Sequence, residues 1–517
     1  MRVYNINKAI GLASSGVEYA QKYRRGIFAD IAWVDDYYVF TDYMGTNITV
    51  FSDRLGFPRS QVMWIYNVLS GREARPSTVT IDEFRQMLGQ SHSVPQPGPD
   101  RTFDVALAGS DLRYRIRTLD GKIVDRVETL AGDQVVRVEH YDQTLNNVEH
   151  LYDNRVVRRV FYAPDGRVAA EQSYRDDEIV RTVITAASPL YAPPTNSRRG
   201  RSTSFRGDVV LDGRSQFFQF VFGRLLSRPD DVVIVDRALD VIDGLYPVIG
   251  EHRLYSVVHA EHFDLKQVED GVLLWNNHYE HVFTRPDLVD ALVVSTDRQK
   301  QTLERQLSAG EPRAPFTVVR IPVGVVATSA APEYDRLALV TASRLASEKH
   351  LDILIRALSV ARRAVPGLRL DIFGEGSREG LLEVIRETET QDCVRLMGHH
   401  DLNGLFGSYG LYVTASTSEG FGLSLLEAMA EGLPLVGFDV DYGNRELIEP
   451  DVNGALVPVP VGALISSVNL FAEAIVAVVT SGSLDAMREQ SLQKAQGFTA
   501  ANVRTLWERL LSEEDEC

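Results

Sequence analysis

Cysteine is scarce in this chain of 517 residues, which contains two, Cys393 and Cys517. Two cysteines cannot form the disulfide framework of a small secreted domain, and a chain of this length buries a core that needs no such framework. Positive charge is also in deficit, because 54 lysines and arginines stand against 71 acidic residues and give a net charge of −17. Such a surface repels phosphate backbones, so the composition disfavours a nucleic-acid partner.

Long apolar runs are missing as well. A membrane-spanning helix needs about 20 consecutive apolar residues, and runs such as 232–235 are far shorter. Residues 1–7 lack the apolar segment of a signal peptide. We therefore expect a cytoplasmic protein, and peripheral association with the inner face of the cell membrane stays open.

The middle of the chain has its own pattern. Between residues 110 and 185, polar and apolar residues alternate in five stretches, at 113–118, 123–130, 135–141, 156–162 and 167–174. Alternation with a period of two is typical of half-buried strands, and the Asp-Gly pairs between some of them favour hairpin turns. The sequence predicts an antiparallel meander whose polar face is turned to water or to a partner.

Short apolar strands and helical stretches alternate on both sides of this meander. A strand at 2–5, a helix at about 16–28 and a strand at 38–41 precede it, and strands follow at 232–235, 255–258, 291–295, 317–321, 337–342, 368–373, 394–397, 411–414 and 433–438. This alternation favours parallel, doubly wound sheets, with too many strands for one sheet. We predict an α/β protein with two Rossmann-like domains facing each other across a cleft. The first of these domains consists of residues 1–45 and 207–325, and the second consists of residues 326–500. An inserted β-rich domain spans 46–206, and a C-terminal helix spans 501–517.

Candidate ligand-binding residues follow the strands directly, because doubly wound sheets bind ligands at the carboxyl ends of their strands. Arg344 and Lys349 follow the strand at 337–342. A guanidinium fork and an ammonium charge near a helix start can hold a diphosphate, although both residues could equally form surface ion pairs. Gly374 and Gly376 follow the strand at 368–373 and serve either ligand approach or turn geometry.

The most specific pattern follows the strand at 411–414, where Glu419 and Glu427 stand on either side of Gly420 and Gly422. Glycines let backbone amides approach a ligand closely. A carboxylate in the first turns of the next helix can accept hydrogen bonds from both vicinal hydroxyls of a ribose. A solvated helix residue is the alternative for Glu427 alone.

Two further patterns resemble metal sites. Asp439 and Asp441 form a D-x-D sequence, which we interpret here as a loop. His259 and His262 follow the strand at 255–258, but no cysteine or third histidine has the spacing of a zinc site. A histidine there can instead bond a sugar hydroxyl, position a leaving phosphate, or pack in the core. We expect no metal site.

Arg344, Lys349 and the Glu419/Glu427 pair together resemble the motifs of retaining family-4 glycosyltransferases of GT-B fold, over residues 1–45 and about 207–517. A narrower resemblance rests on the N-terminal stretches at 4–7 and 13–20, on the insertion and on the segment at 259–262. They resemble the catalytic protein glycosyltransferases of the accessory secretion system of Gram-positive bacteria. The wall-teichoic-acid α-glycosyltransferases are similar and share the insertion.

The resemblance implies transfer of N-acetylglucosamine from UDP-GlcNAc to Ser/Thr hydroxyls of serine-rich repeat adhesins, with retention of configuration and no metal. It also implies a non-catalytic paralogue as partner, bound through the inserted sheets. Arg344 and Lys349 would neutralise the diphosphate, Glu427 would hold the ribose and Glu419 the donor sugar. The remaining predicted contacts are Gly16 to phosphate, His259 to the sugar, Gly374, Gly376, Met397 and His399 around the uracil, and Gly420, Phe421, Gly422 and Leu423 in the donor-binding loop.

Three alternatives remain open at this point. A paralogue that kept the fold and lost the chemistry should lack some of these charged residues, yet Arg344, Lys349, Glu419, Glu427 and His259 are all present. An enzyme of the same fold could act on teichoic acid, a lipid or a free sugar, although a chain of net charge −17 suits a polyanionic acceptor poorly. Glucose or N-acetylgalactosamine could replace N-acetylglucosamine as donor sugar.

Overall fold

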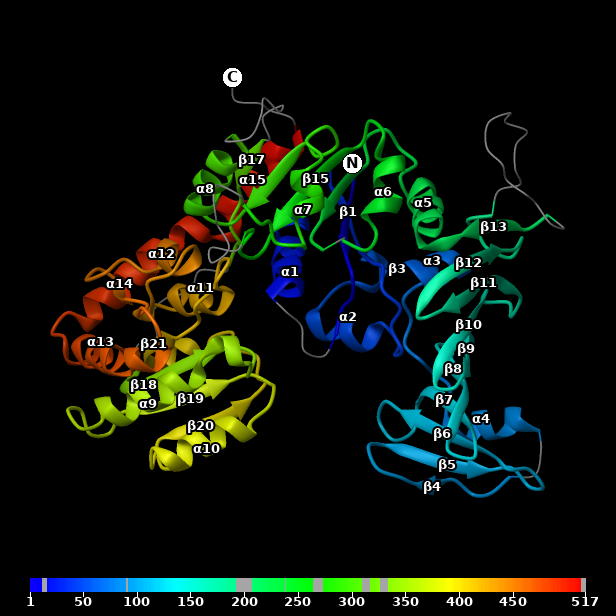
Figure 1. The fold of residues 1–517 in the computed structure, drawn as a ribbon, viewed down its shortest axis with the longest axis horizontal. Coiled ribbons are helices and arrows are strands. Elements are labelled where there is room, and N and C mark those ends of the chain that lie inside the picture. Colours follow the sequence, from blue (N-terminus) through cyan, green and yellow to red (C-terminus); the bar gives the residue numbers. More distant parts are fainter. Residues whose placement is uncertain are drawn as a thin grey trace. The chain divides into compact units, whose positions relative to one another are not determined.

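The chain divides into two compact units in the computed structural model (Figure 1), one of Met1–Leu12 with Asp35–Leu254 and one of Ala13–Val34 with Tyr255–Cys517. The structure describes residues 1–11, 16–89, 92–191, 207–237, 239–263, 273–308, 317–325 and 333–512. Residues 13–15, which begin the stretch 13–20 named above, and the last residues of the predicted C-terminal helix lie outside these ranges.

A parallel sheet of order β14-β1-β2-β3 lies in the first unit. Its strands are β1 (Arg2–Asn7), β2 (Asp35–Phe40), β3 (Val62–Trp64) and β14 (Val232–Val235). The helices of this unit are α2 (Thr49–Leu55), α3 (Ile65–Ser70), α4 (Ile81–Leu88), α5 (Gly213–Leu225) and α6 (Ile242–Ile249). All four residues of β14 are buried, as in a parallel sheet covered on both faces.

A ten-stranded antiparallel sheet runs in strict sequence order from β4 to β13 (Figure 1). Its strands are β4 (Gln96–Pro97), β5 (Thr102–Ala106), β6 (Leu112–Thr118), β7 (Val124–Ala131), β8 (Gln134–Tyr141), β9 (Leu145–Tyr152), β10 (Arg155–Tyr162), β11 (Val168–Arg175), β12 (Glu178–Ile184) and β13 (Val209–Asp212). The predicted meander is confirmed, and it is twice as long as the five stretches indicated.

Arg72 joins the end of α3 to this sheet. Its guanidinium donates to Asp142 at 2.6 and 2.7 Å and to the carbonyl oxygens of Tyr162, Leu145 and Ala163 at 2.6, 2.8 and 3.1 Å. The Arg72 and Asp142 side chains are 4% and 6% exposed. Removal of one partner from a buried ion pair leaves the other charge desolvated and unpaired.

The variant Arg72→Met is therefore expected to lower the free energy of unfolding of the first unit by about 3–5 kcal/mol. Urea titration followed by circular dichroism measures this change. Arg75→Met is the matched control, because Arg75 pairs with Glu73 on the surface, where the two side chains are 53% and 76% exposed. Equal transition midpoints for the two variants would contradict the role given to Arg72.

The second unit holds two sets of parallel strands. The first set, in the order β17-β16-β15, consists of β15 (Arg253–Val258), β16 (Ala291–Val294) and β17 (Val318–Arg320). The second has the order β20-β19-β18-β21-β22-β23 and consists of β18 (Asp335–Ala342), β19 (Arg369–Phe373), β20 (Val394–Gly398), β21 (Tyr409–Thr414), β22 (Leu435–Phe438) and β23 (Gly454–Val457). The strands predicted in this part of the chain are confirmed, with small shifts at their ends.

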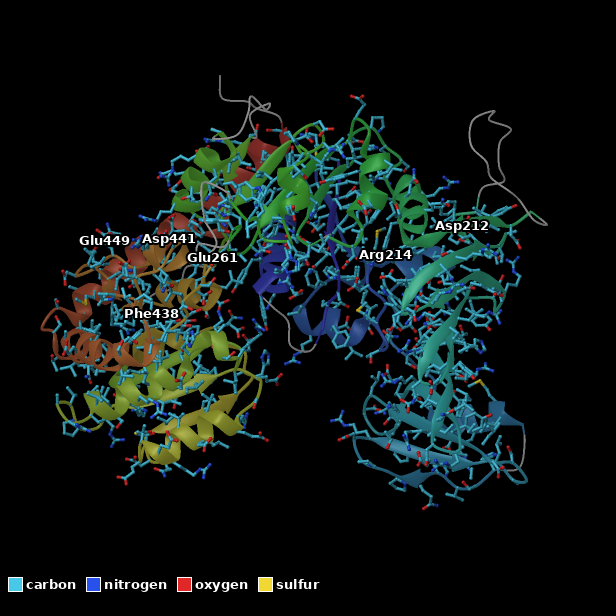
Figure 2. All side chains as sticks on the ribbon, in the orientation of Figure 1. Asp212, Arg214, Glu261, Phe438, Asp441 and Glu449 are labelled. Atoms are coloured by element: carbon cyan, nitrogen blue, oxygen red, sulfur yellow. The ribbon has the colours of Figure 1, made fainter. Side chains whose placement is uncertain are left out.

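Helices complete the second unit. They are α1 (Gly16–Phe28), α7 (Glu280–Phe283), α8 (Asp297–Ser308), α9 (Leu351–Ala361), α10 (Glu379–Glu387), α11 (Leu423–Ala430), α12 (Gly443–Leu447), α13 (Val468–Thr480), α14 (Leu484–Ala495) and α15 (Ala500–Ser512). The predicted helix at 16–28 is confirmed at both ends. Phe438 of β22, labelled in Figure 2, packs edge-on against Phe471 of α13 with ring centroids 4.8 Å apart.

In the part of the chain that the structure describes, no single helix is long and apolar enough to cross a membrane. One pair, Leu464–Thr480 with Leu484–Phe498, reaches the required length and composition together, but it is bent by 99°.

Candidate active site

Lys349 and Glu419 meet where the order of the six-stranded sheet reverses. Strands β18 and β21 are neighbours in its middle, so the loops that follow them lie side by side. Lys349 Nζ lies 2.7 Å from Glu419 Oε1 and 3.3 Å from Ser416 Oγ. The two charged side chains are 18% and 20% exposed. The structure thus brings together two of the residues that the sequence predicted for the site.

Arg344 has a different environment. Its side chain is 56% exposed, and it donates to Glu348, four residues further on, at 2.8 Å. The structure therefore shows Arg344 in the surface ion pair that was the alternative interpretation. Its role at a diphosphate stays a prediction.

The loops after β18, β19 and β20 are joined through their backbones. Gly374 N donates to the carbonyl oxygen of Gly398 at 2.8 Å, and Leu345 N donates to that of Glu375 at 2.8 Å. A Cβ on Gly374 would lie 1.8 Å from the carbonyl oxygen of Ser343, and the φ of +139° also favours glycine. Glycine is needed here so that the two backbones can approach each other. Of the other residues predicted around a uracil, Met397 is half-buried in β20, His399 follows β20 and is exposed, and Gly376 has a φ of +145°.

Glu427 lies in α11 and accepts a hydrogen bond from the hydroxyl of Tyr23 in α1. Burial raises the pKa of Glu427 to about 7, with a smaller contribution from Glu431. The Tyr23 hydrogen bond and the charge of Lys22 act in the opposite direction. Glu427 is therefore a half-buried carboxyl group whose pKa is raised to near neutral.

The beginnings of α1 and α11 lie next to each other. A Cβ on Gly16, the first residue of α1, would lie 3.9 Å from Leu423 Cδ1, and Leu423 is the first residue of α11. Gly422, with a φ of +80°, precedes it. Helix N-termini carry unpaired N–H groups and partial positive charge, so two of them together favour an anion such as a diphosphate.

His259 follows β15 and lies against the loop that carries Glu419. A Cβ on Gly420 would lie 2.0 Å from the carbonyl oxygen of His259, so the two backbones are in direct contact. The amide of His259 donates to the hydroxyl of Tyr279 at 3.0 Å. The carbonyl oxygen of Glu419 accepts from Tyr442 N at 3.1 Å and completes the anchoring of this loop. Phe421 is buried in the same loop.

His262 is a packed histidine rather than a metal ligand. Its Nε2 lies 2.7 Å from Gln306 Oε1, and its ring stacks on Tyr442 with centroids 5.8 Å apart. Burial lowers the pKa of His262 to about 4. Both ring nitrogens have protein neighbours, since Gln299 Nε2 lies 3.5 Å from Nδ1.

Both carboxylates of the D-x-D sequence form ion pairs with arginines. Arg445 Nε lies 2.5 Å from Asp439 Oδ1, and Arg298 Nε lies 2.7 Å from Asp441 Oδ1 (Asp441 is labelled in Figure 2). Within the described ranges, no group of three or more His, Cys, Asp or Glu residues could hold a metal ion. The loop interpretation of Asp439 and Asp441 agrees with these contacts.

Sequence reasoning missed the hydroxyl groups of Tyr23, Tyr279 and Ser416, which contact Glu427, His259 and Lys349 of the predicted site. Only Tyr23 had a signal in the sequence. It stands seven residues after Gly16, two helical turns along α1, and therefore lies on the same face of that helix. Ser416 and Tyr279 lie outside the regular strand and helix patterns that guided the prediction.

Known proteins with similar sequences and structures support one class. The family described as "Glycosyl transferases group 1" matches residues 336–481. The GtfA subunit of a UDP-N-acetylglucosamine–peptide N-acetylglucosaminyltransferase from Streptococcus gordonii is 34% identical over 99% of both chains. The crystal structure of pneumococcal O-GlcNAc transferase GtfA in complex with UDP and GlcNAc has a TM-score of 0.89 at 32% identity and covers 100% of this chain and 99% of that one.

Two further solved structures extend the comparison. A GtfA/B complex matches with a TM-score of 0.84 at 32% identity over 99% of each chain. TarM matches with a TM-score of 0.77 at 16% identity over 99% of this chain and 98% of its own, which is a likeness of fold.

The parallel sheets, the separate antiparallel sheet and the residues gathered after β18 and β21 define a glycosyltransferase of GT-B fold, as predicted. The similarity to known proteins over the full length of the chain identifies a narrower group within this class. The chain belongs to the GtfA family of glycosyltransferases, the group that its sequence motifs resembled.

Proposed function

We propose that this chain transfers N-acetylglucosamine from UDP-GlcNAc to Ser/Thr hydroxyls of a serine-rich repeat protein, with retention of configuration. The observation that carries the proposal is the Lys349–Glu419 pair, 2.7 Å apart, at the carboxyl ends of β18 and β21. Full-length similarity to a GtfA whose solved structure holds UDP and GlcNAc supports the choice of donor.

The roles within the site follow from charge and position. Lys349 and the adjacent starts of α1 and α11, with the amide of Gly16, neutralise the diphosphate as the bond to the sugar breaks, and Arg344 adds a second cation. Negative charge grows on the leaving diphosphate in the transition state, so cations aimed there stabilise it more than they stabilise the ground state. Glu419 and His259 then hold the donor sugar.

The nucleoside is held by the rest of the site. Glu427 accepts hydrogen bonds from the ribose hydroxyls. The joined loops at Gly374, Gly376, Met397 and His399 frame the uracil, and residues 420–423 cover the donor from the start of α11.

The acceptor hydroxyl attacks from the same face that the diphosphate leaves, and the leaving phosphate takes its proton. Glu419, the charged carboxylate of this loop, is paired with Lys349, and such a pair makes a weak nucleophile. An isolated covalent glycosyl-enzyme intermediate would contradict this front-face route.

Metal independence and the partner are further parts of the proposal. Arginines already neutralise Asp439 and Asp441, which supports diphosphate binding by cationic side chains rather than through a metal. The solved GtfA/B complex supports a GtfB-like non-catalytic paralogue as partner, for which the inserted sheet is the proposed contact surface. We place the reaction in the cytoplasm, with peripheral contact at the membrane.

Mass spectrometry of a Ser/Thr-rich repeat peptide tests the proposal directly. The purified chain, alone and with its GtfB-like paralogue, is incubated with UDP-GlcNAc and EDTA, and parallel reactions use UDP-glucose or a polyol-phosphate polymer. Increments of N-acetylhexosamine on the peptide are expected. Modification of the polymer alone would point to a teichoic-acid transferase, and no product in any reaction, despite UDP binding, would point to a non-catalytic paralogue.

The affinity for UDP-GlcNAc is expected to fall about tenfold between pH 8 and pH 6, because the carboxylate that accepts from the ribose becomes protonated through its pKa of about 7. Isothermal titration calorimetry measures the dissociation constants, and the donor has no phosphate group that titrates in this range. Glu427→Gln is the control and should bind weakly with a flat profile.

The stability of the protein is expected to change in the opposite direction with pH. A carboxyl group with a raised pKa stabilises the folded state fully below its unfolded value of 4.5, and this stabilisation is lost as the pH rises through about 7. Affinity for the donor that is the same at pH 6 and pH 8 would show that Glu427 does not bind the ribose as an anion.

A further inference from the structure

Tyr23 contacts the predicted ribose-binding carboxylate through its hydroxyl group. The Tyr23 hydroxyl donates to Oε1 of Glu427, and burial raises the pKa of Tyr23 well above its usual range, so the tyrosine remains a donor at all relevant pH values. The Tyr23 ring also packs against the apolar cluster around α11. The sequence motifs of the site do not include this residue.

The hydrogen bond leaves Glu427 free to bind a diol. An ionised carboxylate offers about four acceptor positions on its two oxygens, and Tyr23 uses one of them. Among the residues that the structure describes, Oε2 of Glu427 has no hydrogen-bond partner. Two ribose hydroxyls can therefore bind while the tyrosine remains in place.

The position of Tyr23 also connects the two ends of the nucleotide site. Gly16 and Tyr23 lie two turns apart on one face of α1, and Leu423 and Glu427 lie one turn apart on one face of α11. Gly16 faces Leu423, and Tyr23 bonds Glu427. The same pair of helices thus sets the place of the diphosphate and the orientation of the ribose carboxylate.

We propose that Tyr23 is a positioning residue for donor binding: it fixes one oxygen of Glu427 so that the other faces the ribose hydroxyls of the UDP-sugar. This inference rests on the proposed function, and specifically on ribose recognition by Glu427. The observed polar contact of Tyr23 is with Glu427, so the residue is expected to act on affinity and on ribose selectivity rather than on the chemical step.

The test compares UDP with 2′-deoxy-UDP at pH 8 by calorimetry. The wild-type chain is expected to prefer UDP about tenfold, because the deoxy ligand lacks one hydrogen bond to a charged acceptor. In Tyr23→Phe the affinity for UDP should fall about fivefold to tenfold and the preference should shrink to about twofold. The KM for UDP-GlcNAc should rise with little change in kcat.

The pH profile gives a second, independent measurement. The Tyr23 hydrogen bond lowers the pKa of Glu427, so its loss should move the midpoint of UDP-GlcNAc binding to higher pH. Tyr334→Phe is the matched control, since Tyr334 donates to Asp485 at 2.5 Å next to the amino end of β18, away from the site. This control should keep the affinity, the selectivity and the midpoint of the wild type.

Glu427→Gln separates failure of the inference from failure of the proposed site. If Glu427→Gln loses the preference for UDP while Tyr23→Phe keeps both the preference and the midpoint, the inference is overturned and the site stands. If Glu427→Gln keeps the preference for UDP, Glu427 does not bind the ribose. In that case both the inference about Tyr23 and the proposed role of Glu427 are overturned. A Tyr23→Phe variant that loses affinity for both nucleotides equally would show that Tyr23 only supports the fold.

Discussion

Replacement of Lys349 by methionine is expected to lower kcat/KM for UDP-GlcNAc by about 10³-fold and to leave the fold intact. The lysine is the cation of the site that lies next to Glu419, at 2.7 Å, and its side chain is only 18% exposed. Removal of one preorganised electrostatic contact to developing charge costs about 10²–10³ in kcat. Weaker binding of the diphosphate in the ground state adds to this loss. Steady-state kinetics with a repeat peptide measures the effect.

Lys494→Met is the control for this experiment. Lys494 lies in α14, and its Nζ is 3.6 Å from a carboxylate oxygen of Glu449. Its replacement removes the same charge from a residue that pairs with neither Lys349 nor Glu419. The double variant Lys349→Met with Glu419→Gln should lose little more than the single variant, because residues that act as a unit are strongly non-additive. Activity of Lys349→Met within threefold of the wild type would show that another cation binds the diphosphate.

The parallel strands were predictable because each is a short, nearly continuous apolar run. The strand at 232–235 and the helix at 16–28 were placed to the residue, since their ends coincide with the ends of the apolar pattern. The pairing of β18 with β21 was not readable in the sequence, because about 70 residues separate them. That pairing is what brings Lys349 and Glu419 together.

Strand β9 shows why half of the antiparallel sheet was missed. Its sequence contains Asn146 and Asn147, which are buried and bond to one another and to Asn67. Side chains that satisfy each other inside the protein break the alternation of polar and apolar residues on which strand prediction depends. The pattern therefore showed the strands with apolar inner faces and hid this one.

The sequence named candidate residues for the site but could not show the contacts among them. Gly374 could have served a ligand or a turn, and only the 1.8 Å between its Cβ position and Ser343 shows that close backbone contact requires it. The sequence predicted a donor-sugar contact for His259 and assigned no role in the site to His262, and the Gln306 contact shows that His262 packs in the core. Such distinctions depend on neighbours that are remote in the sequence.

Replacement of Gly420 by alanine is expected to lower kcat by at least 10²-fold with a folded protein. The added Cβ would lie 2.0 Å from the carbonyl oxygen of His259 and 2.9 Å from Ala260 Cα, and both are backbone atoms that cannot rotate away. The loop must therefore move away from the end of β15 and take Glu419 with it. Displacement of a positioned group by about 1 Å costs on the order of 10²-fold in rate.

Gly380→Ala controls for the change of residue type, because no atom lies within 4 Å of its Cβ position in α10. Alanine in a helix is stabilising relative to glycine, so this variant should keep full activity. Measuring the affinity for UDP shows whether Gly420→Ala loses activity because the donor sugar is mispositioned or because the nucleotide is bound less tightly. The nucleoside contacts proposed for Gly374 and Glu427 lie on other elements, so UDP affinity should change much less than kcat. Equal losses of UDP affinity and kcat would show that the loop holds the nucleotide rather than the sugar, and would move Glu419 to that role.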